Sequence, residues 1–320
     1  MESSKSKSTE VLRAAVIACV GRHVVPGQRL LVGLSGGIDS VVLLHCLRPI
    51  ASQRCLQLAG LHVHHGLSPN ADAWEAHCRA LCEAWGVGLT VARVEVERGS
   101  RDGLEAAARR ARHAVFAQAE GDWVVLAHHR DDQAETLLFN LLRGTGVRGA
   151  AAMSEAPGRL LRPLLGIGRD EIETYATENH LRWVEDESNA DTTFSRNHLR
   201  HQVLAGLERR FPGSGANLAA AARRFGEAQS LLDDLARIDI GGTADDFPIE
   251  VHLLASLAEP RARNVLRFLL QQRHIGIPSE ERLREALRQL TQAAADRHPA
   301  IAFGNHRLLR RGGRIVLEPN

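Results

Sequence analysis

A glycine-rich turn at residues 35–40 constrains the fold of this chain more than any other feature. It reads Ser35-Gly36-Gly37-Ile38-Asp39-Ser40, follows an apolar strand pattern at 29–34 and precedes an apolar helix pattern at 41–47. Glycines let the backbone approach phosphate oxygens, and a helix N-terminus directs N–H groups and a partial positive charge at them. The turn lacks the lysine of a Walker loop and the spacing of a dinucleotide-binding turn. We therefore expect a phosphate-binding turn here, with a plain helix N-cap as the alternative.

Strand and helix patterns alternate from this turn to about residue 200. Further strand patterns lie at 56–63, 87–96, 122–127 and 160–165, and helix patterns lie at 70–85, 103–120, 131–143 and 169–180. This alternation predicts a fold of the α/β class, with a doubly wound parallel sheet that is covered by helices on both faces. In such a sheet, ligands bind at the carboxyl ends of the strands.

Helix patterns dominate the rest of the chain. They lie at 217–238, 251–273 and 279–295, where the last one starts with the helix signal Pro278-Ser279-Glu280-Glu281, and a polar loop is expected at 241–246. A turn signal at 311–314 predicts a C-terminal hairpin over 300–317. We expect four parts: an N-terminal tail and helix at 1–25, the α/β domain at 26–206, a helical linker at 207–238 and a small, mainly helical domain at 239–320.

Lysine is almost absent from the sequence. Lys5 and Lys7 lie in a polar N-terminal segment, and every other basic side chain apart from histidine is arginine. Mechanisms that need a catalytic lysine, such as a lysine–AMP intermediate or a Schiff base, are therefore excluded. Phosphate groups must be bound by arginine, backbone N–H, histidine or a metal, and the planar guanidinium suits bidentate phosphate contacts.

The five cysteines show no pairing or metal-binding pattern, which favours reduced, mostly buried thiols in the cytosol. No apolar run approaches about 18 residues, and the N-terminus has no apolar leader segment. We therefore expect no membrane association and a cytoplasmic location. The net charge of +2 does not by itself indicate a nucleic-acid partner.

Two polar clusters follow predicted strands. The first, His62-Val63-His64-His65-Gly66-Leu67, should lie beside the 35–40 turn; zinc at His64 and His65 is disfavoured, because adjacent side chains point apart. The second runs over 127–136 and contains His128, His129, Asp132 and Glu135. Asp132 and Glu135 are three residues apart on one helix face, so the pair is suited to an ammonium group or Mg²⁺. Acidic residues that only cap the helix are the alternative.

Several arginines are candidates for contacts with phosphate or nucleic acid. Arg109 and Arg112 share a helix face, for which a solvated surface is an equal alternative, and Arg143 is expected to face the same cleft as Asp132. Arg196 and Arg200 lie one helical turn apart and follow Trp183-Val184-Glu185-Asp186-Glu187-Ser188-Asn189. An aromatic residue, acids and two arginines suit a nucleic-acid rim, although a capped surface helix would look similar.

Taken in order, these motifs resemble one family. The segments S-G-G-I-D-S, H-V-H-H-G-L-S, H-H-R-D-D-Q-A-E-T, L-R-G-T-G, R-P-L-L, W-V-E-D-E-S-N and R-N-H-L-R resemble those of tRNA(Ile)-lysidine synthetases, which are PP-loop ATP pyrophosphatases. The resemblance is strong over about residues 28–205 and weaker through the helical region to the hairpin. It implies a PP-loop domain at 26–206 and a tRNA-contacting domain at 239–320.

The resemblance also implies a reaction and its cofactors. ATP, with Mg²⁺, would adenylate the C2 oxygen of cytidine 34 in the CAU anticodon of tRNA(Ile), and the side-chain amine of free L-lysine would then displace AMP. Adenylation must come first, because C2 of cytosine is a poor electrophile until its oxygen becomes a good leaving group. The lysine ammonium must lose a proton, and Asp132, Glu135 and His129 remain open as its acceptor.

Residue roles follow from the matched motifs. Pyrophosphate and Mg²⁺ are assigned to Ser35, Gly36, Gly37, Asp39 and Ser40, with Asp39 as the metal ligand. The lysine ammonium is assigned to Asp132 and Glu135, adenine to the backbone at Val63 and His64, and ATP phosphates to Arg109 and Arg112. Contacts to the anticodon loop are assigned to Arg143, Arg196, Asn197 and Arg200.

Two alternatives and one departure accompany this interpretation. Many family members continue into a further C-terminal domain that grips the tRNA acceptor stem, whereas this sequence ends at residue 320. A PP-loop tRNA thiolase is the nearest alternative, but it needs catalytic cysteines or an iron–sulfur site at an edge loop. A non-catalytic tRNA-binding protein is the second, and a homodimer is left open.

Overall fold

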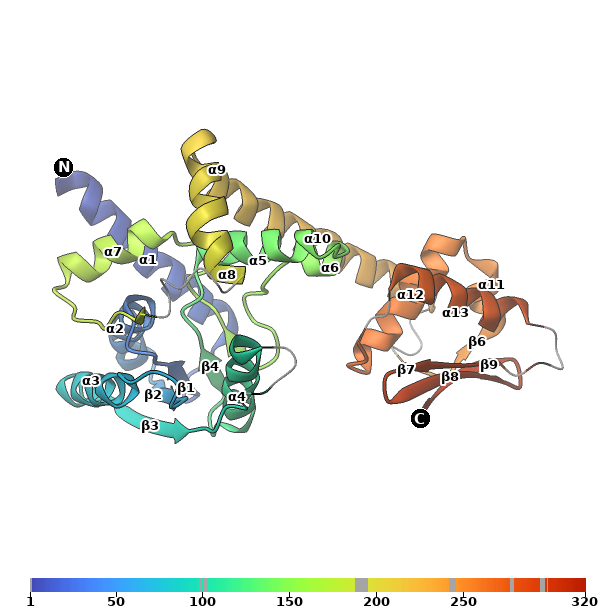
Figure 1. The fold of residues 1–320 in the computed structure, drawn as a ribbon, viewed down its shortest axis with the longest axis horizontal. Coiled ribbons are helices and arrows are strands. Elements are labelled where there is room, and N and C mark those ends of the chain that lie inside the picture. The colour runs from blue at the N-terminus through green and yellow to red at the C-terminus, as the bar shows by residue number, and fades with distance from the viewer. Residues whose placement is uncertain are drawn as a thin grey trace. The chain divides into compact units, whose positions relative to one another are not determined.

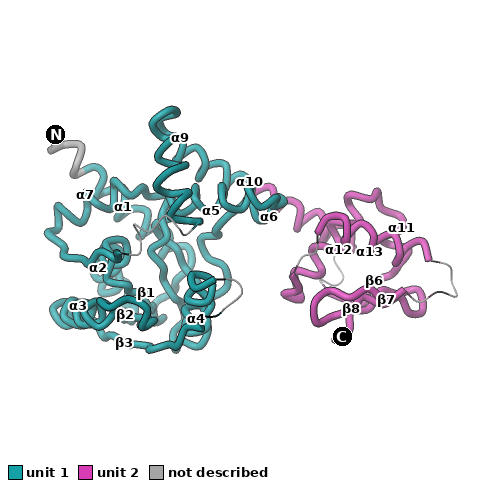
Figure 2. Tube along the Cα trace, in the orientation of Figure 1, with its two compact units in different colours: residues 1–226 teal, residues 227–320 magenta. Residues whose placement is uncertain are grey.

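The chain divides into two compact units in the computed structural model, which describes residues 2–97, 99, 103–187, 195–241, 246–276, 279–293, 297 and 299–320. The units are residues 1–226 and 227–320, and the division falls inside the long helix α10 (Ser214–Asp239) (Figure 2). Most of the polar loop expected at 241–246, the start-signal residue Pro278, the end of the helix expected at 279–295 and residues 188–189 lie outside the described residues. The four-part division expected from the sequence stays a prediction.

A five-stranded parallel sheet forms the centre of the first unit (Figure 1). Its strands are β1 (Arg29–Gly33), β2 (Gln57–His64), β3 (Gly88–Arg93), β4 (Trp123–Val125) and β5 (Leu160–Leu161). They are ordered β3-β2-β1-β4-β5, so the winding direction reverses between β1 and β4. The carboxyl ends of β1 and β4 flank the position where doubly wound sheets bind ligands, as the sequence predicts.

Alternating side chains of β1 face two different cores. Leu30 and Val32 belong to a large core with helices α1 (Glu2–His23), α2 (Ile38–Gln53), α3 (Ala71–Ala84) and α7 (Arg169–Glu178). Leu31 faces the other side of the sheet and packs with Phe116 of α4 (Leu104–Gln118). This alternation is that of a strand covered on both faces, so the sheet is held rigidly beneath its carboxyl edge.

Helix α5 (Arg130–Leu142) follows β4 and carries the acids predicted for the site. Its residue Leu137 packs with Ala150 of α6 (Val147–Ala150) and Ala222 of α10. Helical segments follow α7: α8 (Ser195–His198), a π-helical stretch (Leu199–Leu204) and α9 (Ala205–Arg210). The π-helical stretch packs against α5, and irregular helix of this kind is frequent at functional sites.

The second unit combines helices α11 (Val251–Ser256), α12 (Glu259–Gln272) and α13 (Glu280–Gln292) with an antiparallel sheet. The sheet consists of β6 (Ile249–Glu250), β7 (Ala300–Phe303), β8 (His306–Arg311) and β9 (Arg314–Pro319), in the order β6-β9-β8-β7. The predicted hairpin is therefore β8–β9, and two more strands extend it. The expected hairpin does not include the second turn at Gly304-Asn305, although Gly-Asn is itself a hairpin turn signal.

The helix expected over 251–273 is two helices rather than one. Leu257 ends α11 in an extended conformation, and Pro260 stands in the first turn of α12. Proline lacks an N–H and is tolerated only where a helix begins, so it starts a new helix there. Ser279 caps α13 by accepting a hydrogen bond from the Arg282 N–H, as its sequence signal predicts. Among the described residues, no helix is both long and apolar enough to cross a membrane.

Candidate active site

The 35–40 turn joins β1 to α2 and needs glycine at its second position. Gly36 has a φ of +91°, and a Cβ there would lie 3.0 Å from Val184 Cγ2 and 3.2 Å from Cys78 Sγ. The Ser40 hydroxyl donates to the Gly37 carbonyl oxygen at 2.9 Å, which tightens the turn. The first N–H groups of a helix have no partner within the helix, so the start of α2 offers donors for phosphate oxygens.

Asp39 lies in the first turn of α2 with its carboxylate 29% exposed. The Arg169 Nη1 donates to both of its oxygens at 3.0 Å. Burial raises the pKa of Asp39 and outweighs the opposing charges of His129 and Arg169. Arg169 is held in turn by Glu173 at 2.9 Å, and its backbone N–H donates to Asp131.

The sequence interpretation missed Arg169. One signal was available: an arginine at the first position of a helix is unfavourable beside the positive end of the helix dipole. Such a residue needs a nearby anion, and here Asp39, Glu173 and Asp131 supply the negative charge.

His129 caps the N-terminus of α5. Its ring Nδ1 accepts the backbone N–H of Asp131 at 3.3 Å. The backbone N–H of His129 donates to Asp132 Oδ2 at 3.0 Å, which completes a capping box. Its Nε2 lies 3.5 Å from Asp132 Oδ2 and 3.9 Å from Asp39 Oδ1. The capping alternative considered for the acids is thus partly correct, with histidine rather than an acid as the cap.

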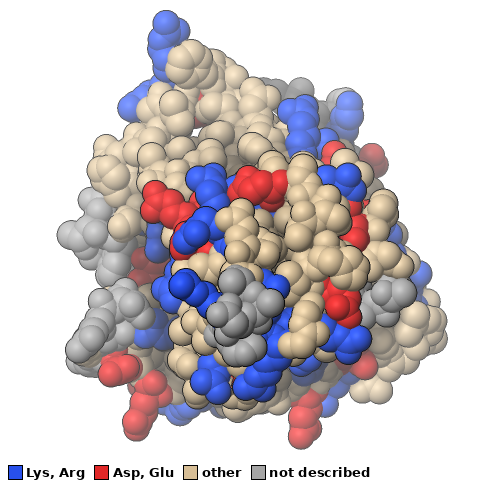
Figure 3. Space-filling model, turned by 90° about the vertical axis from the view of Figure 1, so that its right-hand side faces the viewer, with Lys and Arg blue, Asp and Glu red and all other residues tan. Residues whose placement is uncertain are grey.

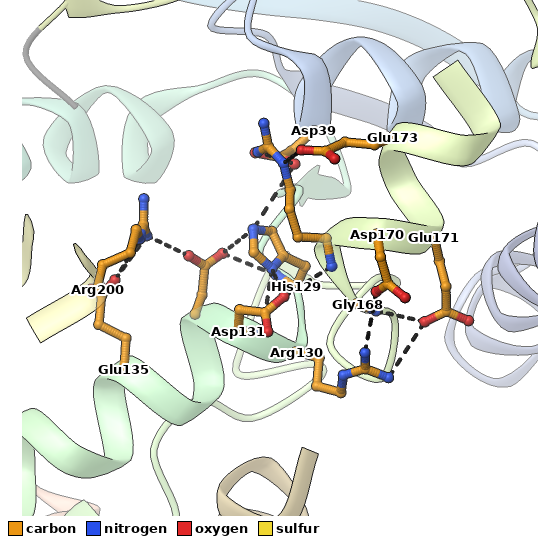
Figure 4. Close-up of polar contacts among 12 residues, drawn as sticks. Asp39, His129, Arg130, Asp131, Glu135, Gly168, Asp170, Glu171, Glu173 and Arg200 are labelled. Carbon is orange, nitrogen blue, oxygen red and sulfur yellow. Dashed lines mark hydrogen bonds and ion pairs between the residues drawn. The ribbon is translucent and has the colours of Figure 1, made fainter. Parts of the chain in front are cut away.

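Burial lowers the pKa of His129, but hydrogen bonding to Asp131 and the charges of Asp132 and Asp39 outweigh it, so its pKa is raised overall. In Figure 4, His129 lies between Asp39 and Asp131 and connects the start of α2 to the start of α5. A raised pKa means that the ring binds a proton more readily, and the Nδ1 that accepts the Asp131 N–H does so in the neutral form of the ring.

Asp132 and Glu135 point to one place, as their spacing predicts, and Arg200 fills it. The Arg200 Nη2 lies 2.9 Å from Asp132 Oδ1 and 2.8 Å from Glu135 Oε2, and its Nε donates to Glu135 at 3.0 Å (Figure 4). The Glu135 side chain is only 4% exposed. Burial raises its pKa despite the nearby Arg200, so the ionised carboxylate depends on a cationic partner.

A cavity of about 590 Å³ lies beside this acid pair. It is lined by the end of β2 and the following loop, by α4, by α5 and by α8 with the π-helical stretch. The predicted site residues that line it are Val63, His64, Arg109, Arg112, Asp132, Glu135, Arg196, Asn197 and Arg200. Sites predicted from segments far apart in the sequence are therefore brought to one cavity.

The other predicted residues do not line this cavity. Ser35, Gly36, Gly37, Asp39 and Ser40 form the adjoining turn, and His129 stands between the turn and the acid pair. Arg143, expected to face the same cleft, instead lies with its guanidinium 5.2 Å from the centre of the Phe139 ring. The guanidinium of Arg196, which lines the cavity, lies 5.6 Å from the same ring centre. Phe139 therefore lies between Arg143 and a residue of the cavity wall.

Arg109 and Arg112 bring positive charge to the cavity, which Glu105 and, for Arg109, Glu135 oppose in part. Burial is the main cause that lowers the pKa of each, and the neighbouring arginines lower it further. Neither forms an ion pair with an acid in the part of the chain that the structure describes. Two half-buried guanidinium groups without partners suit an anionic ligand better than a solvated surface.

The histidines that follow β2 have separate roles. His62 Nδ1 lies 2.8 Å from the Leu34 carbonyl oxygen and ties the ends of β1 and β2 together. The Nδ1 of His65 is buried without a partner among the described residues, and burial lowers the pKa of His65 to about 4. The neutral ring of His65 thus leaves one nitrogen available to a ligand in the cavity.

His64 pairs with acids of α3 rather than with His65. Its Nε2 lies 3.1 Å from Asp72 Oδ1, and the ligand atoms of His64, Asp72 and Glu75 all lie within 4.8 Å of one another. Arg93 contacts both of these acids, at 3.3 Å and 2.7 Å, so they are already compensated. The arrangement fixes the end of β2 at the wall of the cavity.

The cysteines are not arranged for thiol chemistry. Burial raises the pKa of Cys19 and Cys78 to about 12 and that of Cys46 and Cys82 to about 11, so these thiols stay protonated and unreactive. Cys55 is exposed, but it precedes β2 and lies at the amino edge of the sheet, away from the 35–40 turn. This disfavours the thiolase alternative.

Arginines of the second unit are mostly ion-paired where the structure describes them. Examples are Arg267 with Glu280 and Arg314 with Glu250. Figure 3 shows basic side chains interspersed with acidic ones on the face drawn there. Any nucleic-acid contact of this unit therefore depends on particular arginines rather than on one continuous basic surface.

Comparison with known proteins agrees with this geometry. Residues 6–207 match the PP-loop domain family, which makes the first unit a member of the PP-loop class of ATP-using domains. Residues 250–316 match a family described as the TilS substrate binding domain. A fold likeness covers 70% of this chain and 80% of the U34-tRNA thiolase NcsA from Methanococcus maripaludis, solved with its [4Fe-4S] cluster, with a TM-score of 0.57. The sequence identity there is 19%, so this likeness concerns the fold alone.

Curated relatives identify the family more narrowly. The tRNA(Ile)-lysidine synthase of Nitrosomonas europaea is 44% identical over 305 residues, which cover 93% of this chain and 67% of that protein. Those of Azoarcus sp. and Aromatoleum aromaticum are 46% and 45% identical, over 89% and 94% of this chain. The chain belongs to the tRNA(Ile)-lysidine synthase family. It spans 63% of the length of the Azoarcus relative and 71% of the Aromatoleum relative.

Proposed function

We propose that this chain forms lysidine in the anticodon of tRNA(Ile). The C2 oxygen of cytidine 34 attacks the α-phosphorus of ATP and pyrophosphate leaves. The side-chain amine of free lysine then attacks C2, AMP leaves with that oxygen, and the amine loses its protons to acceptors in the site. The observation that carries the proposal is the buried Asp132–Glu135 pair, which holds a side-chain cation beside a phosphate-binding turn.

The 35–40 turn and the cavity arginines support ATP as the cofactor. The donors at the start of α2 would hold the departing pyrophosphate, and Arg109 and Arg112 are unpaired cations suited to the phosphate chain. The backbone at Val63 and His64, with the free Nδ1 of His65, would border the adenine ring. The catalytic gain would come from fixed positive groups around the charge that develops on the phosphates.

Asp39 fits the role of a magnesium ligand. Mg²⁺ takes oxygen ligands, usually one or two carboxylates together with substrate phosphates, and Asp39 supplies a half-buried carboxylate beside the turn. Because Arg169 and His129 now neutralise this carboxylate, the residues have to exchange partners when the ion binds. Bound there, Mg²⁺ would neutralise charge on the pyrophosphate leaving group.

Arg200 supports lysine as the amine substrate. Its guanidinium occupies the position that Asp132 and Glu135 would offer to the lysine ammonium, so it stands in for the missing cation. One buried carboxylate pair cannot fully satisfy two cations at once, so lysine has to displace Arg200 from at least one acid. The displaced guanidinium is then free to contact the tRNA backbone, as the anticodon assignment of Arg200 requires.

The tRNA substrate rests on the rim residues and on the second unit. Arg196 and Asn197 line the cavity beside Arg200, and the match of residues 250–316 to a substrate binding domain supports a tRNA contact there. Cytoplasmic location is part of the same proposal, since tRNA and ATP are both present in that compartment. A homodimer stays a prediction.

One experiment tests the whole proposal. The chain is incubated with ATP, Mg²⁺, lysine and tRNA(Ile) carrying a CAU anticodon, and the anticodon nucleosides are analysed by mass spectrometry. Lysidine at position 34, dependent on both ATP and lysine, is the expected result. A thiolated product in a parallel reaction that contains sulfide in place of lysine would establish the thiolase alternative, and tRNA binding without pyrophosphate release would establish the non-catalytic one.

A further inference from the structure

A second cavity, of about 580 Å³, lies in the first unit away from the candidate active site. Its walls come from α1, the end of α2, the loop before β3 and the end of α7. Leu58 near the start of β2 lines this cavity, whereas His64 at the end of β2 lines the first one. Six residue steps along a strand span about 20 Å, so the two cavities lie at opposite edges of the sheet.

This amino-edge cavity is positively charged. Arg13 and Arg48 line it, and no aspartate or glutamate does. Neither arginine forms an ion pair with an acid anywhere in the described ranges of the chain. Burial lowers the pKa of His45, and the charges of Arg48 and Arg13 lower it further, so both guanidinium groups act on the same point.

Aromatic side chains hold the polar groups of this cavity in place. The Arg48 guanidinium lies 5.1 Å from the centre of the Trp85 ring. The Nδ1 atom of His45 lies 3.0 Å from the Tyr175 hydroxyl, which is hydrogen-bonding distance. Tyr175 is buried, so the side chain that holds the His45 imidazole is itself fixed by packing. The other nitrogen of His45 has no partner among the described residues and remains available to a ligand.

We propose that the amino-edge cavity binds a small molecule that carries a phosphate monoester. A phosphate monoester has a charge of nearly −2 at neutral pH, which matches two guanidinium groups without acidic partners. Planar guanidinium forks bind phosphate oxygens in pairs, and the cavity volume lies within the usual range for small-molecule sites. The walls formed by Trp85, Leu58 and Val87 would contact the organic part of the ligand. The inference does not depend on the proposed function.

The test uses AMP and isothermal titration calorimetry. Wild-type chain should bind two AMP molecules, one in each cavity. The double variant Arg13→Gln/Arg48→Gln should lose one of them, with an affinity loss of at least about tenfold for the removal of charge-assisted bonds. Arg112→Gln should instead weaken the other AMP. An exposed arginine on α9, Arg209, serves as the matched control, and Arg209→Gln should leave both AMP affinities unchanged.

A second measurement separates a free phosphate monoester from RNA phosphate. The tRNA affinity of the double variant is measured by fluorescence anisotropy, and its circular dichroism spectrum and pyrophosphate release show whether it is folded. Loss of AMP binding with unchanged tRNA affinity supports the proposal. Loss of tRNA affinity alone would overturn it in favour of an RNA phosphate site, and a folded variant with both affinities unchanged would overturn it entirely. If Arg112→Gln has no effect while the double variant does, the proposed ATP site fails and the amino-edge cavity stands.

Discussion

Replacing Glu135 by glutamine should weaken the use of lysine far more than the use of ATP. The Glu135 side chain is 4% exposed and contacts a cationic side chain at 2.8 Å, so a lysine ammonium at that position would be held out of bulk water. Glutamine keeps the shape of glutamate and removes its charge. The lost charge-assisted bond corresponds to about 1.5–3 kcal/mol, which is about a ten- to hundredfold rise in the KM for lysine.

The assay is a lysine titration of lysidine formation at saturating ATP and tRNA. Glu105 is the matched control, because it lines the same cavity but its side chain is 47% exposed. Glu105→Gln should leave the KM for lysine within about twofold of the wild-type value, as expected for an exposed charge. Adenylated tRNA should accumulate in Glu135→Gln, since the first step does not use lysine. If Glu135→Gln left the lysine KM unchanged and raised the ATP KM instead, the acid pair would serve Mg²⁺–ATP.

The pH dependence of the wild-type chain gives an independent check on the same residue. Burial raises the pKa of Glu135, so its carboxylate is lost by protonation at a higher pH than an ordinary glutamate, whose pKa is about 4.3. Lysine binding should therefore weaken as the pH falls toward that raised value, and this loss should be absent in Glu135→Gln. Equal acid sensitivity of both proteins would assign the effect to another group.

Four further predictions concern other parts of the protein. Asp39→Asn should reduce pyrophosphate release by about a hundredfold or more, because a metal-bridged phosphate contact contributes several kcal/mol in the transition state; near wild-type turnover would remove Asp39 from the mechanism. The same variant should gain stability relative to wild type as the pH rises above about 4, because the raised pKa of Asp39 means that ionisation of this carboxyl opposes folding. Denaturant titrations of both proteins at several pH values measure the difference in the free energy of unfolding. The opposite trend with pH would contradict this prediction. Serine in place of all five cysteines should leave lysidine formation intact in any folded variant, and loss of modification from one such change would restore the thiolase alternative. Arg196→Ala should weaken tRNA binding without changing the ATP KM, and the tRNA affinity of the wild type should fall steeply with salt; a flat salt response would count against tRNA as the substrate.

Local sequence patterns predict the parallel sheet correctly. The period of the apolar residues distinguishes strands from helices, and strand–helix alternation leaves few arrangements other than a doubly wound sheet. The same logic places the 35–40 turn and the 127–136 cluster at one edge, where β1 and β4 lie side by side. The C-terminal sheet was underestimated, because β6 has only two residues and is stabilised by pairing with β9.

The partners of the charged residues could not be predicted in the same way. Two residues three positions apart in a helix share one face, so the shared face of Asp132 and Glu135 follows from the sequence. Their common partner Arg200, however, lies 65 or more positions away in the sequence. Asp39 and Arg169 are 130 positions apart and meet only because α2 and α7 pack together. A sequence motif names the chemical group, whereas its electrostatic neighbours depend on how distant elements pack.

The sequence by itself determined the class of chemistry of this protein. Its turn at 35–40 is suited to phosphate without a lysine, because glycine and a helix N-terminus are local features, and the ordered motifs identify the family. Only the tertiary structure decided that Arg200 occupies the acid pair, that His129 caps α5 between Asp39 and Asp132, and that Arg109 and Arg112 remain unpaired in the cavity. The reason is physical: backbone conformation follows mainly from neighbouring residues, while pKa shifts, ion pairs and cavities arise from desolvation and charges that folding brings together.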